Sequence, residues 1–159
     1  MSHSTCVSMA KRMDVDEVDA YLRELNDKLF KGLLTVEGPE VWGDKTREWT
    51  FTFKECDDNM LFFTVWYKNK KRLEFQSPHR DWAIWAQMRV RNFLAVKYDG
   101  TMSDEGIDEK WKGDITKWRT YKEYLESLYF NRKTFKAKMA AKLCTRYCMM
   151  SVPKKLKGL

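Results

Sequence analysis

The part of the sequence with the clearest chemical character is its last fifth, where every charged side chain is basic. No Asp or Glu follows Glu126, and Phe135 and Tyr147 lie among the cations. Ammonium and guanidinium groups bind phosphates and carboxylates, so such a run is typical of a segment that contacts an anionic surface. The nine basic residues are Arg132, Lys133, Lys136, Lys138, Lys142, Arg146, Lys154, Lys155 and Lys157.

The rest of the chain is close to neutral. The whole sequence has 30 Lys and Arg against 23 Asp and Glu, and without the last segment 21 basic residues face the same 23 acids. The positive charge is therefore a property of the C-terminal segment, which we expect to bind RNA or another polyanion by displacing its counterions. The alternative partner is an acidic protein surface, and a membrane surface is a less favoured one. If the segment binds nothing, its lysines and arginines simply keep a surface helix solvated.

Other residue types that do chemistry form no arrangement typical of catalysis. The sequence has no glycine-rich phosphate loop, and its adjacent acids stand in polar stretches typical of solvated turns. Cys144 and Cys148 are four residues apart, but zinc takes four ligands, and His3 and His79 are the only histidines. We therefore expect a binding protein that is not an enzyme and uses no metal or cofactor.

The composition predicts an intracellular protein of one domain. A chain of 159 residues with 43% hydrophobic residues can bury a core, and no apolar run approaches the ~20 residues of a membrane helix. Four cysteines are expected to be reduced thiols in the cytoplasm or nucleus, and a short organelle leader is a weak alternative. We expect residues 1–13 to be flexible, residues 14–150 to form the domain and residues 151–159 to form a basic tail, in an oligomeric state that remains open.

The apolar spacing predicts an α+β fold that begins with a helix. Asp14 is a good N-cap, the apolar residues from Val18 to Phe30 follow a helical stripe, and Gly32 ends it. Three strands are expected at residues 48–54, 60–67 and 72–76, in a three- to four-stranded antiparallel meander. The stretch at 101–113 is expected to be a loop or a single helical turn.

Two further helices are expected after the strands. A buried, Trp-rich helix begins at Ser77-Pro78, with Ser as the N-cap, and runs to about residue 97. A long basic C-terminal helix begins near Asp114 or Thr120, either continuous or broken near residues 131–133. Its apolar stripe includes Phe135, and its cations would be presented on a folded helix.

The central strand is apolar on both faces, so one of its faces remains for another purpose. Depending on the register of the hairpin that follows, either Phe62 and Trp66 or the odd-numbered residues between 61 and 67 point away from the helices. We expect Phe62 and Trp66 to form an interaction face that stacks on bases or docks a partner. The alternative is that the last helix covers this face in a three-layer domain.

One segment resembles a known RNA-binding element. Phe135–Leu143, with the sequence FKAKMAAKL, resembles the basic, alanine-rich start of the last helix in double-stranded-RNA-binding domains. The expected order of one helix, three strands and one helix is similar to that of these domains and of the small Alu-RNA-binding proteins of the signal recognition particle. The resemblance implies that the anionic partner is RNA.

Overall fold

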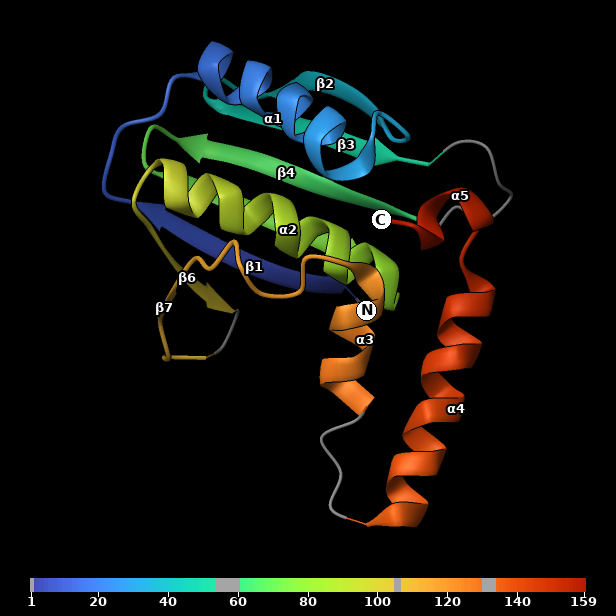
Figure 1. Ribbon diagram of the computed structural model, residues 1–159. Coiled ribbons are helices and arrows are strands. Elements are labelled where there is room, and N and C mark those ends of the chain that lie inside the picture. The colour runs from blue at the N-terminus through green and yellow to red at the C-terminus, as the bar shows by residue number, and fades with distance from the viewer. Residues whose placement is uncertain (1, 54–60, 105–106, 130–133) are drawn as a thin grey trace.

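The computed structural model has an α+β architecture and describes residues 2–53, 61–104, 107–129 and 134–159 (Figure 1). One antiparallel sheet carries helices on one face, and the last helices extend from one end. The strands are β1 (Ser2–Met9), β2 (Thr35–Trp42), β3 (Thr46–Thr52), β4 (Phe62–Asn69), β5 (Arg72–Pro78), β6 (Gly100–Asp104) and β7 (Trp111–Lys112). The helices are α1 (Val15–Phe30), α2 (Asp81–Lys97), α3 (Tyr121–Tyr129), α4 (Phe135–Ser151) and α5 (Lys154–Lys157).

Within the described residues, the sheet has seven strands in the order β2-β3-β4-β5-β1-β6-β7. The mixed α+β class is as predicted, but the meander of three or four strands is wrong, because β1, β6 and β7 extend the sheet beyond β5. The stretch at 101–113, expected to be a loop, supplies β6 and β7. With a strand first, the helix-first order shared with double-stranded-RNA-binding domains is also absent.

The first element is a strand, whereas the sequence predicted a flexible terminus followed by a helix. β1 pairs with β5 on one side and with β6 on the other, so it lies inside the sheet. Thr5, Val7 and Met9 are buried, and Ser4, Cys6 and Ser8 alternate with them on the opposite face. This is the period-2 pattern of a half-buried strand. Because one face of β1 carries only small side chains, mostly polar ones, the sequence predicted a flexible terminus here.

Helix α1 confirms the predicted helix after Asp14. The Asp14 carboxylate accepts hydrogen bonds from the backbone N–H of Asp16 and Glu17, which satisfies two of the free donors at the helix start. The helix closes at Lys31 and Gly32, which adopt left-handed conformations. Its apolar stripe lies on the sheet, as the spacing predicted.

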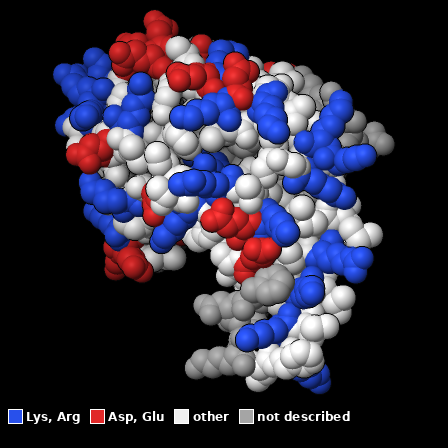
Figure 2. Space-filling view, in the orientation of Figure 1, with Lys and Arg blue, Asp and Glu red and all other residues white. Residues whose placement is uncertain are grey.

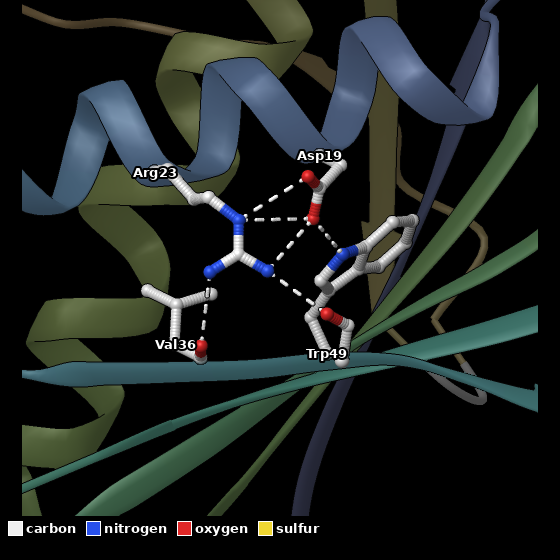
Figure 3. A network of polar contacts seen from close by, with 5 residues as sticks. Asp19, Arg23, Val36 and Trp49 are labelled. Carbon is white, nitrogen blue, oxygen red and sulfur yellow. Dashed lines mark hydrogen bonds and ion pairs between the residues drawn. The ribbon is translucent and has the colours of Figure 1, made fainter.

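A polar network holds α1 against the outer strands β2 and β3 (Figure 3). Arg23 donates to the Asp19 carboxylate and to the carbonyls of Val36 and Gly38, and the Trp49 indole N–H donates to Asp19 Oδ1 at 2.9 Å. Burial alone would raise the pKa of Asp19, but the hydrogen bonds from Arg23 and Trp49 and the guanidinium charge bring it below its ordinary value. Asp19 thus links α1 to β3, and Arg23, which Asp19 holds in place, links α1 to β2.

Helix α2 is buried on nearly all sides, as predicted, but it begins later. Strand β5 extends to Pro78, and α2 starts at Asp81 after Arg80, so Ser77-Pro78 does not cap it. Ser77 is buried as a strand residue. The tryptophans of α2, Trp82 and Trp85, contact the Phe30 ring of α1 with centroid distances of 6.1 Å. These rings form the core between the helices and the sheet.

In its described part, the end of the chain forms the three helices α3, α4 and α5 and not one long basic helix. α3 ends at Tyr129, and α4 begins after the N-cap Thr134, whose side chain accepts from the Ala137 backbone N–H. α4 ends before Pro153, which cannot continue a helix, and the short α5 follows. The last nine residues are not a free tail, since Leu156 and Leu159 are buried in the core. In Figure 1, α3 and α4 project together from one end of the body.

Candidate functional site

The basic residues predicted to bind an anion are presented on folded elements. Lys138, Lys142 and Arg146 recur every four residues on α4, so they form a row about 6 Å apart along the helix. All three are exposed, and none has an ion-pair partner among the described residues. We call them the basic row. In Figure 2, Lys and Arg follow the lower right of the molecule, where α4 lies, among uncharged residues.

The remaining predicted cations surround this row or lie at the chain end. Lys136 is exposed on the first turn of α4, and Lys154 and Lys155 are exposed on α5. Lys157 is half-buried. Arg132 and Lys133 lie outside the described residues.

The apolar stripe of α4 does not face the body. Small residues of α4 pack toward α3: Ala141 and Thr145 are buried and Ala137 is half-buried. The large side chains, at helical spacing on the opposite side, are between 45% and 80% exposed. We call them the apolar stripe, and they are Phe135, Met139, Leu143, Tyr147 and Met150.

A second basic surface, not predicted from the sequence, lies at the other end of the body. A cavity of about 700 Å³ opens where the β1–α1 connection, the β2–β3 turn and the β4–β5 turn meet. Among the described residues, none of its five cations has an ion-pair partner, and Asp44 is its one acid. We call this cavity the basic cleft; its cations are Arg12, Lys45, Arg47, Lys70 and Lys71.

Backbone hydrogen bonds hold the walls of the basic cleft together. The N–H of Met13 donates to the carbonyl of Lys70 at 2.8 Å, and the N–H of Met9 donates to the carbonyl of Lys71 at 2.8 Å. Tyr67 is buried beneath, with its hydroxyl 3.4 Å from the Met13 carbonyl. Burial raises the pKa of Tyr67, against the nearby Arg12 and Arg47 charges, so the hydroxyl stays protonated near neutral pH. The basic cleft is therefore lined by Lys and Arg side chains, and the Tyr67 hydroxyl beneath it carries no charge.

The pairing register of β4 and β5 determines which side chains of β4 face away from the helices. Trp66 pairs with Glu74 and Tyr67 with Leu73, with an irregularity before Asn69, so Trp66 and Phe62 lie on the face away from α1 and α2. Both are half-buried, and Trp66 contacts the Trp42 ring at 5.9 Å between centroids. We call this side of the sheet the open sheet face. That it binds a partner stays a prediction.

The open sheet face is not basic. Glu40 and Glu48 stand opposite each other on β2 and β3, and Glu48 accepts from the Trp42 indole N–H at 2.7 Å. Burial and the neighbouring Glu40 raise the pKa of Glu48, although the Trp42 hydrogen bond opposes them. Lys68 and Arg72, which lie beside these residues, both pair with Glu74. Around Trp66, the described part of this face therefore offers a nucleic-acid backbone no row of unpaired cations.

A buried polar network joins β1 to α2. Arg91 donates to the Thr5 hydroxyl at 2.7 Å, and Thr5 donates to the Asp104 carboxylate at 2.6 Å. Gln87 lies 2.9 Å from Nδ1 of His3. Burial lowers the pKa of Arg91 to about 10, and burial also lowers the pKa of His3. We assign this network to holding β1 in place beneath α2.

The cysteines and carboxylates form no further site in the described part of the chain. No group of three or more His, Cys, Asp and Glu residues there could hold a metal ion. Cys144 is exposed on α4, and Cys6 is half-buried on β1. Cys56 and the side chain of Cys148 are not among the described parts of the structure. In the same described residues, no helix has both the length and the apolar character needed to cross a bilayer.

The basic cleft could have been found from the sequence with one further step. Asn69-Lys70-Lys71 lies between the strands predicted at 60–67 and 72–76, and Lys45 lies just before the strand predicted at 48–54. In an antiparallel meander, alternate turns lie at the same edge of the sheet, so these two basic turns had to be neighbours. The contribution of Arg12 could not be found, because β1 was not recognised.

Comparison of the chain with protein-family models, with curated proteins and with solved structures found no match.

Proposed function

We propose that the protein binds RNA or a similar polyanion through the basic row of α4. The observation that carries this proposal is a helix with exposed cations, no acidic residue and no ion-pair partner for the row among the described residues. On ordinary solvated helices, acids and bases alternate and neutralise one another. Three unpaired cations one turn apart are suited to release counterions from consecutive phosphates.

The basic cleft supports the same function at a second place. Its cations come from three separate segments, so their convergence is a property of the fold and not of local composition. Figure 1 shows that these segments lie at the end of the body opposite α4. An extended polyanion can reach both surfaces, whereas a small anion occupies only one. Two separate cationic surfaces favour RNA over a single acidic protein patch.

Affinity measurements on charge variants test this proposal. A fluorescently labelled, mixed-sequence single-stranded RNA is titrated with the intact chain and with Lys138→Gln/Lys142→Gln at low salt. Removing two phosphate contacts should weaken binding by roughly tenfold or more, since each phosphate contact contributes strongly at low salt. Arg47→Gln/Lys70→Gln tests the cleft in the same way.

The matched control removes two exposed cations elsewhere. Lys110 and Lys117 are exposed and lie outside both basic surfaces, so Lys110→Gln/Lys117→Gln changes the net charge by the same amount. We expect this control to bind within about twofold of the intact chain. Equal losses in the control and the α4 variant would show that only net charge matters. No binding of RNA by the intact chain would contradict the proposal and leave an acidic protein as the candidate partner.

A further inference from the structure

The apolar stripe of α4 has the character of an interface that is uncovered in the single chain. Its five side chains together expose on the order of 600 Å². That is the upper end of the largest apolar patch found on monomeric proteins. Phosphate binding makes no use of Phe135, Leu143 or Met150, so the proposed function does not account for them.

The chain cannot cover this stripe with its own sheet. Both ends of the α3–α4 unit are fixed to the body: Tyr121 and Leu125 of α3 are buried, and Leu156 and Leu159 after α4 are buried in the same core. The backbone N–H of Tyr121 also donates to the carbonyl of Leu159 at 3.1 Å, which closes the hairpin at its base. Turning the stripe onto the open sheet face would require withdrawing these residues from the core. A partner must therefore come from another molecule.

The open sheet face offers an aromatic hollow beside β4. A hollow of about 260 Å³ lies between Phe62, Trp66 and Pro78 and also borders Gln76. Gln76 also borders a second hollow of about 490 Å³, which lies across β5 from the first and has a polar lining from β1, β5 and β6. The stripe from Phe135 to Met150 is about 22 Å long, and the eight residues of β4 extend about 26 Å. The helix can thus lie along the strand.

The charges of the two surfaces are complementary. Beside the aromatic residues, Glu40 and Glu48 have no ion-pair partner within the described part of the chain. On α4, Lys136 and Arg146 each lie about 40° from the centre of the apolar stripe at 100° per residue, which places them within the stripe, near its two ends. An apolar strip with a cation near each end therefore meets an aromatic hollow flanked by acids.

We propose that this protein forms a two-fold dimer. In it, α4 of each copy docks on the open sheet face of the other copy. Reciprocal docking buries two stripes and two sheet faces, on the order of 2,400 Å² in total, which exceeds the ~1,200–2,000 Å² of a standard stable interface. Lys138 and Lys142 lie farther from the centre of the stripe, so in the dimer these two residues of the basic row, and not Arg146, stay available to phosphates.

Sedimentation velocity over a range of protein concentrations tests this inference. We expect the intact chain to approach twice its 19.1 kDa mass with rising concentration. Leu143→Asp places a charge in the stripe at an exposed position and should weaken association at least about 30-fold. Cys144→Asp adds the same charge to the same helix outside the stripe, and should leave association within about threefold.

A mixing experiment distinguishes docking on the sheet from pairing of two helices. Trp66→Asp should also abolish association; if it fails to fold, Trp42→Asp at the exposed edge strand replaces it. Mixed with Leu143→Asp, either sheet variant should form a heterodimer, because one intact helix meets one intact face. A monomeric intact chain would overturn the inference. So would a mixture that stays monomeric, or association that Leu143→Asp leaves unchanged.

Discussion

Removing the Asp19 carboxylate should destabilise the fold by an amount that the structure allows us to work out. In Asp19→Ala, the indole N–H of the fully buried Trp49 loses its acceptor, which costs about 1–3 kcal/mol. The lost pair with Arg23 adds less than about 1 kcal/mol, because both side chains are partly exposed and solvent screens the charges. We expect a total of about 1–4 kcal/mol, which lowers the Tm by roughly 2–4 °C for each kcal/mol in a chain of this length.

Urea unfolding followed by tryptophan fluorescence measures this loss as a change in the free energy of unfolding. Asp19→Asn is the matched variant, since its amide oxygen can still accept from Trp49, and it should cost only about 1 kcal/mol. The pKa of Asp19 is lowered in the fold, so its contribution is present above the unfolded pKa and is lost as the pH falls through the folded pKa. A loss below about 0.5 kcal/mol in Asp19→Ala, or equal losses in both variants, would refute the reasoning.

Other parts of the molecule give further predictions. Because burial lowers the pKa of His3, the unfolded chain binds more protons below about pH 6.5, and stability should decrease on acidification from pH 7.5 to 5.5. His3→Gln should reduce that decrease in the urea midpoint, and an unchanged pH dependence would contradict the assignment. Leu156→Ala should cost about 2–5 kcal/mol, since Leu156 is fully buried at the base of the α3–α4 hairpin. Exposed Lys154→Ala is its control and should stay within about 0.5 kcal/mol in thermal unfolding.

The parts of the fold that were predictable are those whose pattern is local and strong. Asp14 and Gly32 bracket α1, and the alternation around Trp49 and Phe51 marks β3, because capping and period-2 burial depend only on near neighbours. β1 was missed because its buried face includes a threonine and its other face is small and polar. Its position between β5 and β6 depends on partners about 70 and 100 residues away.

For the candidate site, the sequence indicated where the cations gather but not how the fold presents them. The sequence placed the cations and an apolar stripe on one helix, but it left open whether that helix packs on the body. The structure buries the small residues Ala141 and Thr145 of α4 and leaves Leu143 exposed. Periodicity identifies an apolar stripe but does not state which partner covers it. The basic cleft needed the tertiary fold, because it joins Arg12 to Lys70 across the sheet edge.

The salt dependence of RNA binding tests the central claim, that the basic row of α4 neutralises phosphates. Anisotropy titrations of single-stranded RNA at several salt concentrations give log K against log salt, with a slope of about −0.7 for each phosphate contact. We predict a steep negative slope for the intact chain, and a slope smaller in magnitude by about 1.4 for Lys138→Gln/Lys142→Gln. An intact chain with a nearly flat dependence, or a variant with the same slope as the intact chain, would contradict the claim.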